Sequence, residues 1–280
     1  METDIYQIDA FCKDLFSGNP AAVCPLAAWP AETLMQQIAA ENNLAETAFY
    51  VAEGDHFRIR WFTPTVEVDL CGHATLAAAH VLFHHKSFTG DIVRFASRSG
   101  ELLVKKEGDR LTLDFPADTL TPIPVTEEMY TWFDKRPEEA YKGKTDYMLV
   151  FGSQTDIANI QPNMPVLEKL TEARGVIVTA KGDGSDDSAT AKTGRGANPS
   201  GDTLDFVSRF FGPQSGVPED PVTGSAHTTL TPYWSKRLGK KDLTAQQLSA
   251  RKGYLRCKDA GARIEISGLA KTYLIGRLFA

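Results

Sequence analysis

Two short stretches of the sequence place a glycine at the start of a predicted helix, with chemically capable side chains beside it. The first is Asp69-Leu70-Cys71-Gly72-His73, and the second is Asp220-Pro221-Val222-Thr223-Gly224-Ser225. The first N–H groups of a helix lack partners within it and carry partial positive charge, and glycine allows close approach to the backbone. Each stretch is therefore a candidate anion site. If both helix starts face one cleft, they would hold a small carboxylate and stabilise charge that develops on it.

Glu46 is the candidate acid/base. It is flanked by Ala45 and by the apolar pair Ala48-Phe49, which makes its side chain a candidate for burial. Burial raises the pKa of a carboxyl group, which suits a group that must take up and return a proton near neutral pH. The alternative from the residues alone is a surface glutamate that ends a helix, and the sequence by itself leaves both interpretations open.

The other side chains around the two glycines have both functional and structural interpretations. His73 could bind substrate or relay a proton, or it could simply cap its helix. Ser225 could donate to a carboxylate or cap its helix. Asp69 and Asp220 could bind substrate or cap the helices that follow them. We expect His227, one turn further along the second helix, to have a structural role.

These two stretches belong to a divergent internal repeat. Phe57-Arg58-Ile59-Arg60-Trp61-Phe62-Thr63-Pro64 and Phe206-Val207-Ser208-Arg209-Phe210-Phe211-Gly212-Pro213 share four identical residues, and a fifth position is aromatic in both. Each segment is followed by an aspartate and then by the helix-opening glycine. A repeated strand–turn–helix unit predicts a protein made of two similar halves.

Hydrophobic periodicity assigns the elements that would position these residues. Helices are predicted at 31–42, 72–84, 126–133, 165–173 and 225–238. Strands are predicted at 47–51, 57–62, 92–95, 102–106, 111–115, 146–151, 175–180, 205–211, 253–258, 263–267 and 272–278. Many strands with one long helix in each half indicate an α+β protein.

A proline- and threonine-rich stretch at 116–124 predicts the domain boundary. We expect an N-terminal half at 1–118 and a C-terminal half at 119–269, with the last strand, 270–280, packing on the first half. The stretch 182–202 has almost no large apolar residues and cannot bury enough surface to order itself. We expect it to be a flexible insertion, and a lid is its functional alternative.

Composition argues against several classes of protein. The chain is 42% hydrophobic and 24% charged, which is typical of a globular protein. A net charge of -6 argues against nucleic-acid binding. The four cysteines show no zinc-ligand spacing and fit a reducing compartment. Neither a signal peptide nor a membrane-long apolar run is evident. We therefore expect a cytoplasmic protein with no metal, membrane or nucleic-acid partner.

Five motifs together resemble the PhzF family of phenazine-biosynthesis-like isomerases. They are Phe16-Ser17-Gly18-Asn19-Pro20-Ala21-Ala22-Val23, Asn43-Leu44-Ala45-Glu46-Thr47, Phe62-Thr63-Pro64, Cys71-Gly72-His73-Ala74-Thr75 and Glu219-Asp220-Pro221-Val222-Thr223-Gly224-Ser225-Ala226-His227. The resemblance runs from Ile5 to Leu278. It implies the diaminopimelate-epimerase-like fold, in which two pseudo-symmetric halves each wrap a strongly curved, mostly antiparallel, barrel-like sheet around a central helix. The family's active site lies in the cleft between the halves.

The resemblance also implies an activity. The best-known member of the family isomerises a dihydro-hydroxyanthranilate by shifting a hydrogen, without metal or organic cofactor. We therefore expect a biosynthetic, cofactor-independent isomerase that moves a proton on a small carboxylate-containing substrate. Carried onto this sequence, the family's acid/base glutamate, its histidine, its aspartate, its serine and its two backbone-donor glycines are Glu46, His73, Asp220, Ser225, Gly72 and Gly224.

Three departures from the family pattern leave the substrate open. Ala45 stands where a serine is usual, Lys252 replaces a common glycine, and the stretch 182–202 is longer than expected.

Two other functions also stay open. In two-base epimerases of this fold a cysteine precedes each helix-opening glycine, and here Cys71 holds the first of these places and Thr223 the second. A Cys/Thr pair occurs in related dehydratases, so an amino-acid epimerase or a 3-hydroxy-amino-acid dehydratase with Cys71 as base is the enzymatic alternative. Otherwise Cys71 is a small buried residue. The third hypothesis is a non-catalytic binding or interaction protein. A homodimer is the default expectation for assembly.

Overall fold

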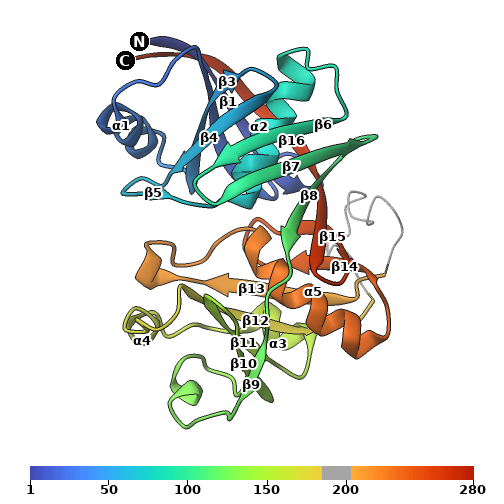
Figure 1. The fold of residues 1–280 in the computed structure, drawn as a ribbon. Coiled ribbons are helices and arrows are strands. Elements are labelled where there is room, and N and C mark those ends of the chain that lie inside the picture. Colours follow the sequence, from blue (N-terminus) through green and yellow to red (C-terminus); the bar gives the residue numbers. More distant parts are fainter. Residues whose placement is uncertain (185–202) are drawn as a thin grey trace. The chain divides into compact units, whose positions relative to one another are not determined.

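A computed structural model describes residues 1–184 and 203–280 of the chain (Figure 1). The residues form two compact units. Unit 1 comprises Met1–Phe115 with Glu265–Ala280, and unit 2 comprises Pro116–Ile264. The chain thus leaves unit 1 after Phe115 and returns to it at Glu265. Most of the insertion predicted at 182–202 lies outside the described residues.

Unit 1 is built on a sheet that closes on itself. Its strands are, in spatial order, β1 (Glu2–Cys12), β2 (Asn19–Leu26), β3 (Glu46–Glu53), β4 (His56–Phe62), β6 (Ile92–Ser97), β7 (Gly100–Glu107), β8 (Arg110–Pro116) and β16 (Arg263–Phe279). The short β5 (Glu67–Val68) pairs with β4. Strand β1 pairs antiparallel with both β2 and β16, so the two ends of the path meet. Closure of this kind removes exposed strand edges.

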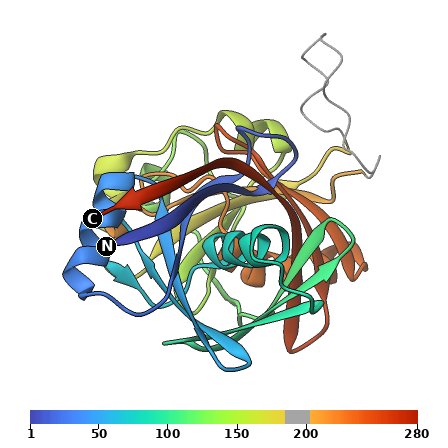
Figure 2. The same cartoon turned by 90° about the horizontal axis from the view of Figure 1, so that it is seen from above.

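The helix α2 (Gly72–His85) forms the centre of unit 1. All its residues from Gly72 to Leu82 are buried, as expected for a helix that is apolar on all sides. It packs against β1, β2, β3 and β7, and Figure 2 shows it surrounded by the strands of its unit. The second helix of the unit, α1 (Glu32–Asn42), instead buries one face, with Met35 and Ile38, in a core beside Phe49.

In the sheet of unit 2, the strands lie side by side in their order along the chain, from β9 to β15. Helix α5 (Gly224–Leu238) packs against β14 and β15. Its strands are β9 (Thr121–Ile123), β10 (Glu139–Lys142), β11 (Asp146–Val150), β12 (Gly175–Lys181), β13 (Phe206–Phe211), β14 (Asp242–Gln247) and β15 (Gly253–Asp259). Short helices complete it: η1 (Met129–Thr131), α3 (Gln154–Asn159), α4 (Met164–Leu167) and η3 (Pro213–Ser215).

The pairing pattern of the strands repeats between the units. Successive neighbours along β2, β3, β4, β6 and β7 pair parallel, antiparallel, parallel and antiparallel. Successive neighbours along β11, β12, β13, β14 and β15 pair in the same order. The repeated sequence segments occupy β4 and β13, the middle strands of the two series. The predicted α+β class, with its curved sheet and central helix, is confirmed.

The repeated arginine makes the same interaction in both units. In unit 1, Arg60 forms a two-pronged pair with Glu67, with the Nε–Oε1 distance 2.7 Å. In unit 2, Arg209 forms the same kind of pair with Glu219, again at 2.7 Å from Nε to Oε1. Two parallel N–H···O bonds fix orientation as well as distance. Each pair therefore ties the segment before the helix-opening glycine to the strand that precedes it.

Several predicted elements are corrected by the structure. The helix predicted at 126–133 is only the single turn η1, and that predicted at 165–173 is the four-residue α4. Both segments bury apolar side chains, among them Trp132 and Leu167, without a longer helix. Tertiary packing, which supplies most helical stability, thus set their length. The strands predicted at 263–267 and 272–278 are one continuous strand, β16.

The cysteine and hydropathy patterns also have structural counterparts. All four cysteines are buried free thiols. Within the part of the chain that the structure describes, no helix has the length and apolar character needed to span a membrane.

Candidate active site

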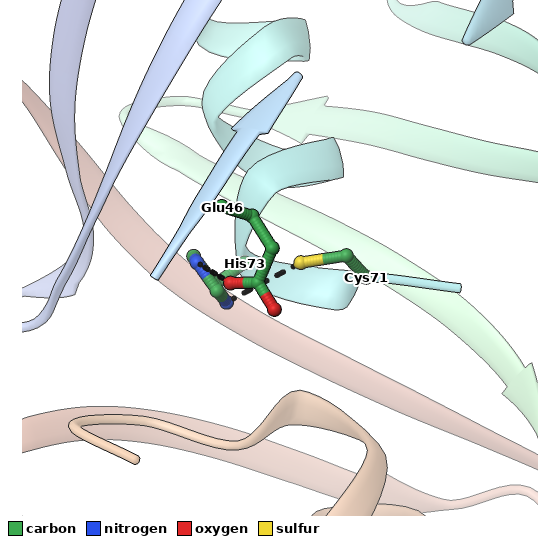
Figure 3. Close-up of side chains that lie close together, drawn as sticks. All are labelled: Glu46, Cys71 and His73. Atoms are coloured by element: carbon green, nitrogen blue, oxygen red, sulfur yellow. Dashed lines mark hydrogen bonds and ion pairs between the residues drawn. The ribbon is translucent and has the colours of Figure 1, made fainter. Parts of the chain in front are cut away.

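Glu46, Cys71 and His73 bring their side chains together in unit 1 (Figure 3). The Oε2 atom of Glu46 lies 3.1 Å from Nε2 of His73. The Sγ atom of Cys71 lies 3.5 Å from Nδ1 of the same ring. The imidazole thus has the carboxylate at one nitrogen and the thiol at the other. The structure therefore places the predicted acid/base, its predicted helper and the alternative base in one group.

The starts of β3 and α2 position this group. Helix α1 is followed by Asn43 in the left-handed conformation, with φ of 49°, which turns the chain into β3. Glu46 is the first residue of β3, so the interpretation as a glutamate that ends a helix is wrong. Cys71 precedes α2 in an extended conformation, and Gly72 begins the helix. A strand start and a helix start thus converge.

The group is buried, and its facing atoms are imperfectly paired. The side chains of Glu46 and His73 are 15% and 5% exposed. Although Oε2 of Glu46 and Nε2 of His73 are close, they are not aligned for a hydrogen bond. Neither atom has another hydrogen-bond partner among the described residues. Buried polar atoms are nearly always paired, so this pair of atoms is in position to bind something else.

The two neighbours of the imidazole alter its titration. Burial acts to lower the pKa of His73, but interactions with Cys71 and Glu46 outweigh burial and raise it well above its ordinary value. Burial, together with the nearby Glu46, raises the pKa of Cys71 to about 11. The thiol therefore keeps its proton at neutral pH, which makes Cys71 a poor base in this environment.

The same three side chains carry metal-binding atoms, which lie within 4.8 Å of one another. A metal ion binds one nitrogen of an imidazole. Here the carboxylate and the thiol approach different ring nitrogens of His73.

The second glycine-led turn carries a hydrogen-bonded group of its own in unit 2. The hydroxyl of Thr223 donates to Oδ2 of Asp220 at 2.6 Å. The backbone N–H of Thr223 donates to Oε1 of Gln247 at 2.8 Å, and the Gln247 amide donates to the Asp220 carbonyl at 2.7 Å. His227 is fully buried and donates from Nδ1 to the Thr223 carbonyl at 2.8 Å. These bonds hold the turn rigid.

The remaining predicted residues lie around the two turns. Asp69 is exposed, and its carboxylate lies 3.7 Å from Arg98. Ser225 is half-buried in the first turn of α5, and Gly72 and Gly224 are the buried first residues of α2 and α5.

The capping roles considered for the two aspartates are wrong. The residues at the N-caps are Cys71 and Thr223, and neither helix has a side-chain capping bond. Asp69 instead pairs with an arginine, and Asp220 accepts from the hydroxyl of the N-cap residue itself.

Two residues of these groups are not among the predicted site residues. Asn19, the fully buried first residue of β2, places its amide nitrogen 3.2 Å from Nδ1 of His73. It lies in the Ser17–Pro20 sequence, where the residue types indicated only a turn. Gln247 ends β14, where nothing in the local sequence distinguishes it from any strand glutamine. Both are brought to the turns by long-range strand pairing.

Comparison with known proteins places the chain in a family. The family model described as phenazine biosynthesis-like protein matches residues 8–276. A Pseudomonas aeruginosa protein described as an isomerase is 48% identical over 278 residues, which cover 99% of both chains. The solved structure of a PhzF family phenazine biosynthesis protein from Enterococcus faecalis covers 100% of both chains, with 42% identity and a TM-score of 0.91.

A more distant likeness concerns the fold alone. A hydroxyproline epimerase from Agrobacterium vitis is only 9% identical but has a TM-score of 0.57, with 99% of this chain and 92% of that chain covered. The fold is thus shared with enzymes that invert a carbon centre. The chain is an isomerase-type enzyme of the phenazine biosynthesis-like, or PhzF, protein family.

Proposed function

We propose that this protein moves a proton between two positions of a small carboxylate-containing metabolite, with Glu46 as the general acid/base. In this proposal His73 assists at the same point, and the start of α2 at Gly72 binds the substrate. Asp220, Gly224 and Ser225 contribute from the second glycine-led turn, as the family resemblance implies. No metal or organic cofactor takes part.

The observation that carries the proposal is the close but misaligned ion pair between Glu46 and His73. A carboxylate oxygen and an imidazole nitrogen lie 3.1 Å apart, out of line for a mutual hydrogen bond and without other partners among the described residues. A buried carboxylate left in this way retains an acceptor position for a proton. General acid/base catalysis requires such a group within hydrogen-bond reach of the substrate.

The start of α2 supplies a complementary charge. Proton abstraction next to a carboxyl or carbonyl group leaves negative charge on the substrate oxygens. The N–H groups of the first turn of a helix stabilise that charge without reorganising. Because Gly72 has no side chain, the substrate oxygens can approach these N–H groups closely. Glu46 and the helix start would then act on neighbouring parts of one bound molecule.

The epimerase or dehydratase alternative would use Cys71 as base. Two observations support Glu46 instead. Burial raises the pKa of Cys71 to about 11, so little thiolate exists near neutral pH. Its counterpart Thr223 donates its hydroxyl proton to Asp220 at 2.6 Å and is therefore already engaged.

Hydrogen exchange tests the proposal. Candidate carboxylates are incubated with the protein in heavy water, and NMR follows deuterium entering carbon positions. Glu46→Gln keeps the size of the side chain but cannot cycle a proton, so we expect the exchange rate to fall by about 10²- to 10⁴-fold. Glu53→Gln is the matched control, because Glu53 is the last residue of the same strand and pairs with Arg58 at the surface.

Three outcomes distinguish the hypotheses. Loss of exchange in Glu46→Gln alone supports the proposal. Loss in Cys71→Ala, with Glu46→Gln still active, would establish the alternative base and overturn the proposal. An absence of exchange across a broad carboxylate library would favour a binding protein that has kept the fold.

A further inference from the structure

Two hydrogen-bond donors converge on one nitrogen of His73. The amide nitrogen of Asn19 lies 3.2 Å from Nδ1, and an amide NH₂ group can only donate. The Sγ atom of Cys71 lies 3.5 Å from the same nitrogen. Because burial and Glu46 raise the pKa of Cys71 to about 11, the thiol carries its hydrogen at neutral pH. In the neutral ring, this arrangement makes Nδ1 the acceptor.

The opposite nitrogen faces an acceptor. Nε2 lies 3.1 Å from the Glu46 carboxylate, whose negative charge attracts a hydrogen on that side of the ring. A neutral imidazole has one hydrogen, and its position is set by the bond that the other nitrogen makes. Donors at Nδ1 and a carboxylate at Nε2 favour the same tautomer.

We infer that Asn19 is a positioning residue that, once His73 has lost a proton and is neutral, keeps the remaining hydrogen on Nε2, beside the Glu46 carboxylate. This inference rests on the proposed function, and it deepens the role of His73 there. The Nε2 hydrogen is not aligned with Glu46, so it is available to a substrate atom at the place where Glu46 exchanges its proton. The ring could then donate to a substrate oxygen while the carboxylate takes a proton from carbon.

The position of Asn19 in the fold supports this role. It is fully buried at the start of β2, and β2 pairs parallel with β3, where Ala21 is opposite Glu46. Strand pairing therefore fixes Asn19 and Glu46 on either side of the imidazole. The groups described as acting on His73 are Glu46 from β3, Cys71 from the N-cap of α2 and the uncharged Asn19 from β2.

Nitrogen NMR of histidine-labelled protein tests the inference directly. Long-range proton–nitrogen correlations show which ring nitrogen carries hydrogen, and spectra from about pH 6 to about pH 10 identify the neutral form. We expect Nε2–H for neutral His73 in the unaltered protein. A neutral form with its hydrogen on Nδ1 would overturn the inference, whether or not a substrate is known.

Two substitutions of Asn19 test its effect on the exchange reaction. Asn19→Leu removes the donor at nearly constant size, and we expect a mixed tautomer with a fall of about 10- to 100-fold in the rate constant for exchange, while KM changes little. Asn19→Asp places a carboxylate at Nδ1, which favours the imidazolium. The midpoint of the nitrogen chemical-shift titration and the pH–rate profile should therefore both move to higher pH. Asn159→Leu, at the exposed end of α3, is the matched control.

The outcomes separate this inference from the proposed function. An unchanged tautomer and an unchanged rate in Asn19→Leu, or an unmoved profile in Asn19→Asp, would contradict the inference while leaving Glu46 as the base. If Asn19→Leu does not fold, the spectrum of the unaltered protein and Asn19→Asp still decide the matter. Failure of the unaltered protein to exchange any substrate would contradict the proposed function but would leave the tautomer result standing.

Discussion

At the scale of single residues, Glu46 and His73 are buried ionisable groups whose facing atoms are poorly aligned. Buried ionisable groups lose hydration, and they regain that energy only through well-formed partners. The facing atoms lie 3.1 Å apart but lack hydrogen-bond alignment. Unpaired buried groups of this kind are typical of sites where binding or catalysis, rather than stability, determines the geometry.

The titration of His73 leads to a prediction about stability. Because its pKa is raised in the folded protein, the folded state binds a proton more tightly than the unfolded chain. The resulting stabilisation is complete below the unfolded pKa of about 6.5 and is lost as pH rises through the folded pKa.

We therefore expect the difference in unfolding free energy between the unaltered protein and His73→Gln to shrink as pH rises from about 6 to about 9, by up to about 1.4 kcal/mol per pH unit. Urea unfolding at several pH values measures it. His56→Gln, which removes a partly exposed histidine, is the control. A difference in unfolding free energy that grows with pH would contradict the predicted direction of this pH dependence.

At the scale of elements, two helix starts with the same backbone form carry different chemistry. Cys71 and Thr223 precede their helices in extended conformations, with φ of -145° and -108°. In unit 1 the turn presents an incompletely paired ionisable group. In unit 2 the corresponding turn is held by Asp220 and Gln247. The repeat thus supplied two similar frames, and the side chains gave them different properties.

The titration of His227 leads to a prediction for the glycine-led turn of unit 2. Burial lowers its pKa to about 4, so the folded protein keeps it neutral while the unfolded chain protonates near pH 6.5. Stability is then complete above that pH and is lost as pH falls towards 4. As pH falls from 7.5 to 5.5, we expect His227 to lower the free energy of unfolding by about 1.4 kcal/mol.

The measurement for His227 is again urea unfolding. His227→Gln should be less stable at pH 7.5 but should lose less stability on acidification than the unaltered protein. Equal acid sensitivity in the two proteins would contradict the assignment of a buried neutral imidazole.

At the scale of the whole molecule, the chain returns to its starting unit. Residues 116–264 form unit 2, and the C-terminal residues from Glu265 then complete unit 1. The N–H of Ala280 donates to the Met1 carbonyl, so the two termini lie side by side (Figure 1). Unit 1 therefore cannot be completed until the last residues of the chain are present. Assembly as a homodimer stays a prediction.

Truncation tests this dependence. Removal of residues 269–280 takes away the part of β16 that pairs with β1 and opens the closed sheet around α2. We expect amide exchange in α2 to accelerate about 100-fold or more, the equivalent of about 3 kcal/mol. Hydrogen-exchange mass spectrometry measures this, with deletion of Ala280 alone as the control. Unchanged protection of α2 would show that the C-terminal part of β16 is dispensable.

The sequence by itself determined the local elements of the catalytic frame. Glycine at residues 72 and 224, the apolar run after Gly72, and the Phe-Arg-aromatic segments before the two glycines predicted both long helices and the strands β4 and β13. These signals are local, since helix starts and strand alternation depend on neighbours within a few residues. The α+β class and the two-fold repeat followed from them.

Only the tertiary structure decided which side chains meet. Asn19, Glu46 and His73 are separated by 54 residues from first to last, and they converge because β2 and β3 pair in one register and α2 fits inside the closed sheet. Register and closure depend on contacts between distant segments, which residue spacing does not encode. For the same reason, the sequence indicated a glutamate and a histidine with catalytic potential, whereas the fold determined that Asn19 would face the imidazole of His73 at the nitrogen opposite Glu46.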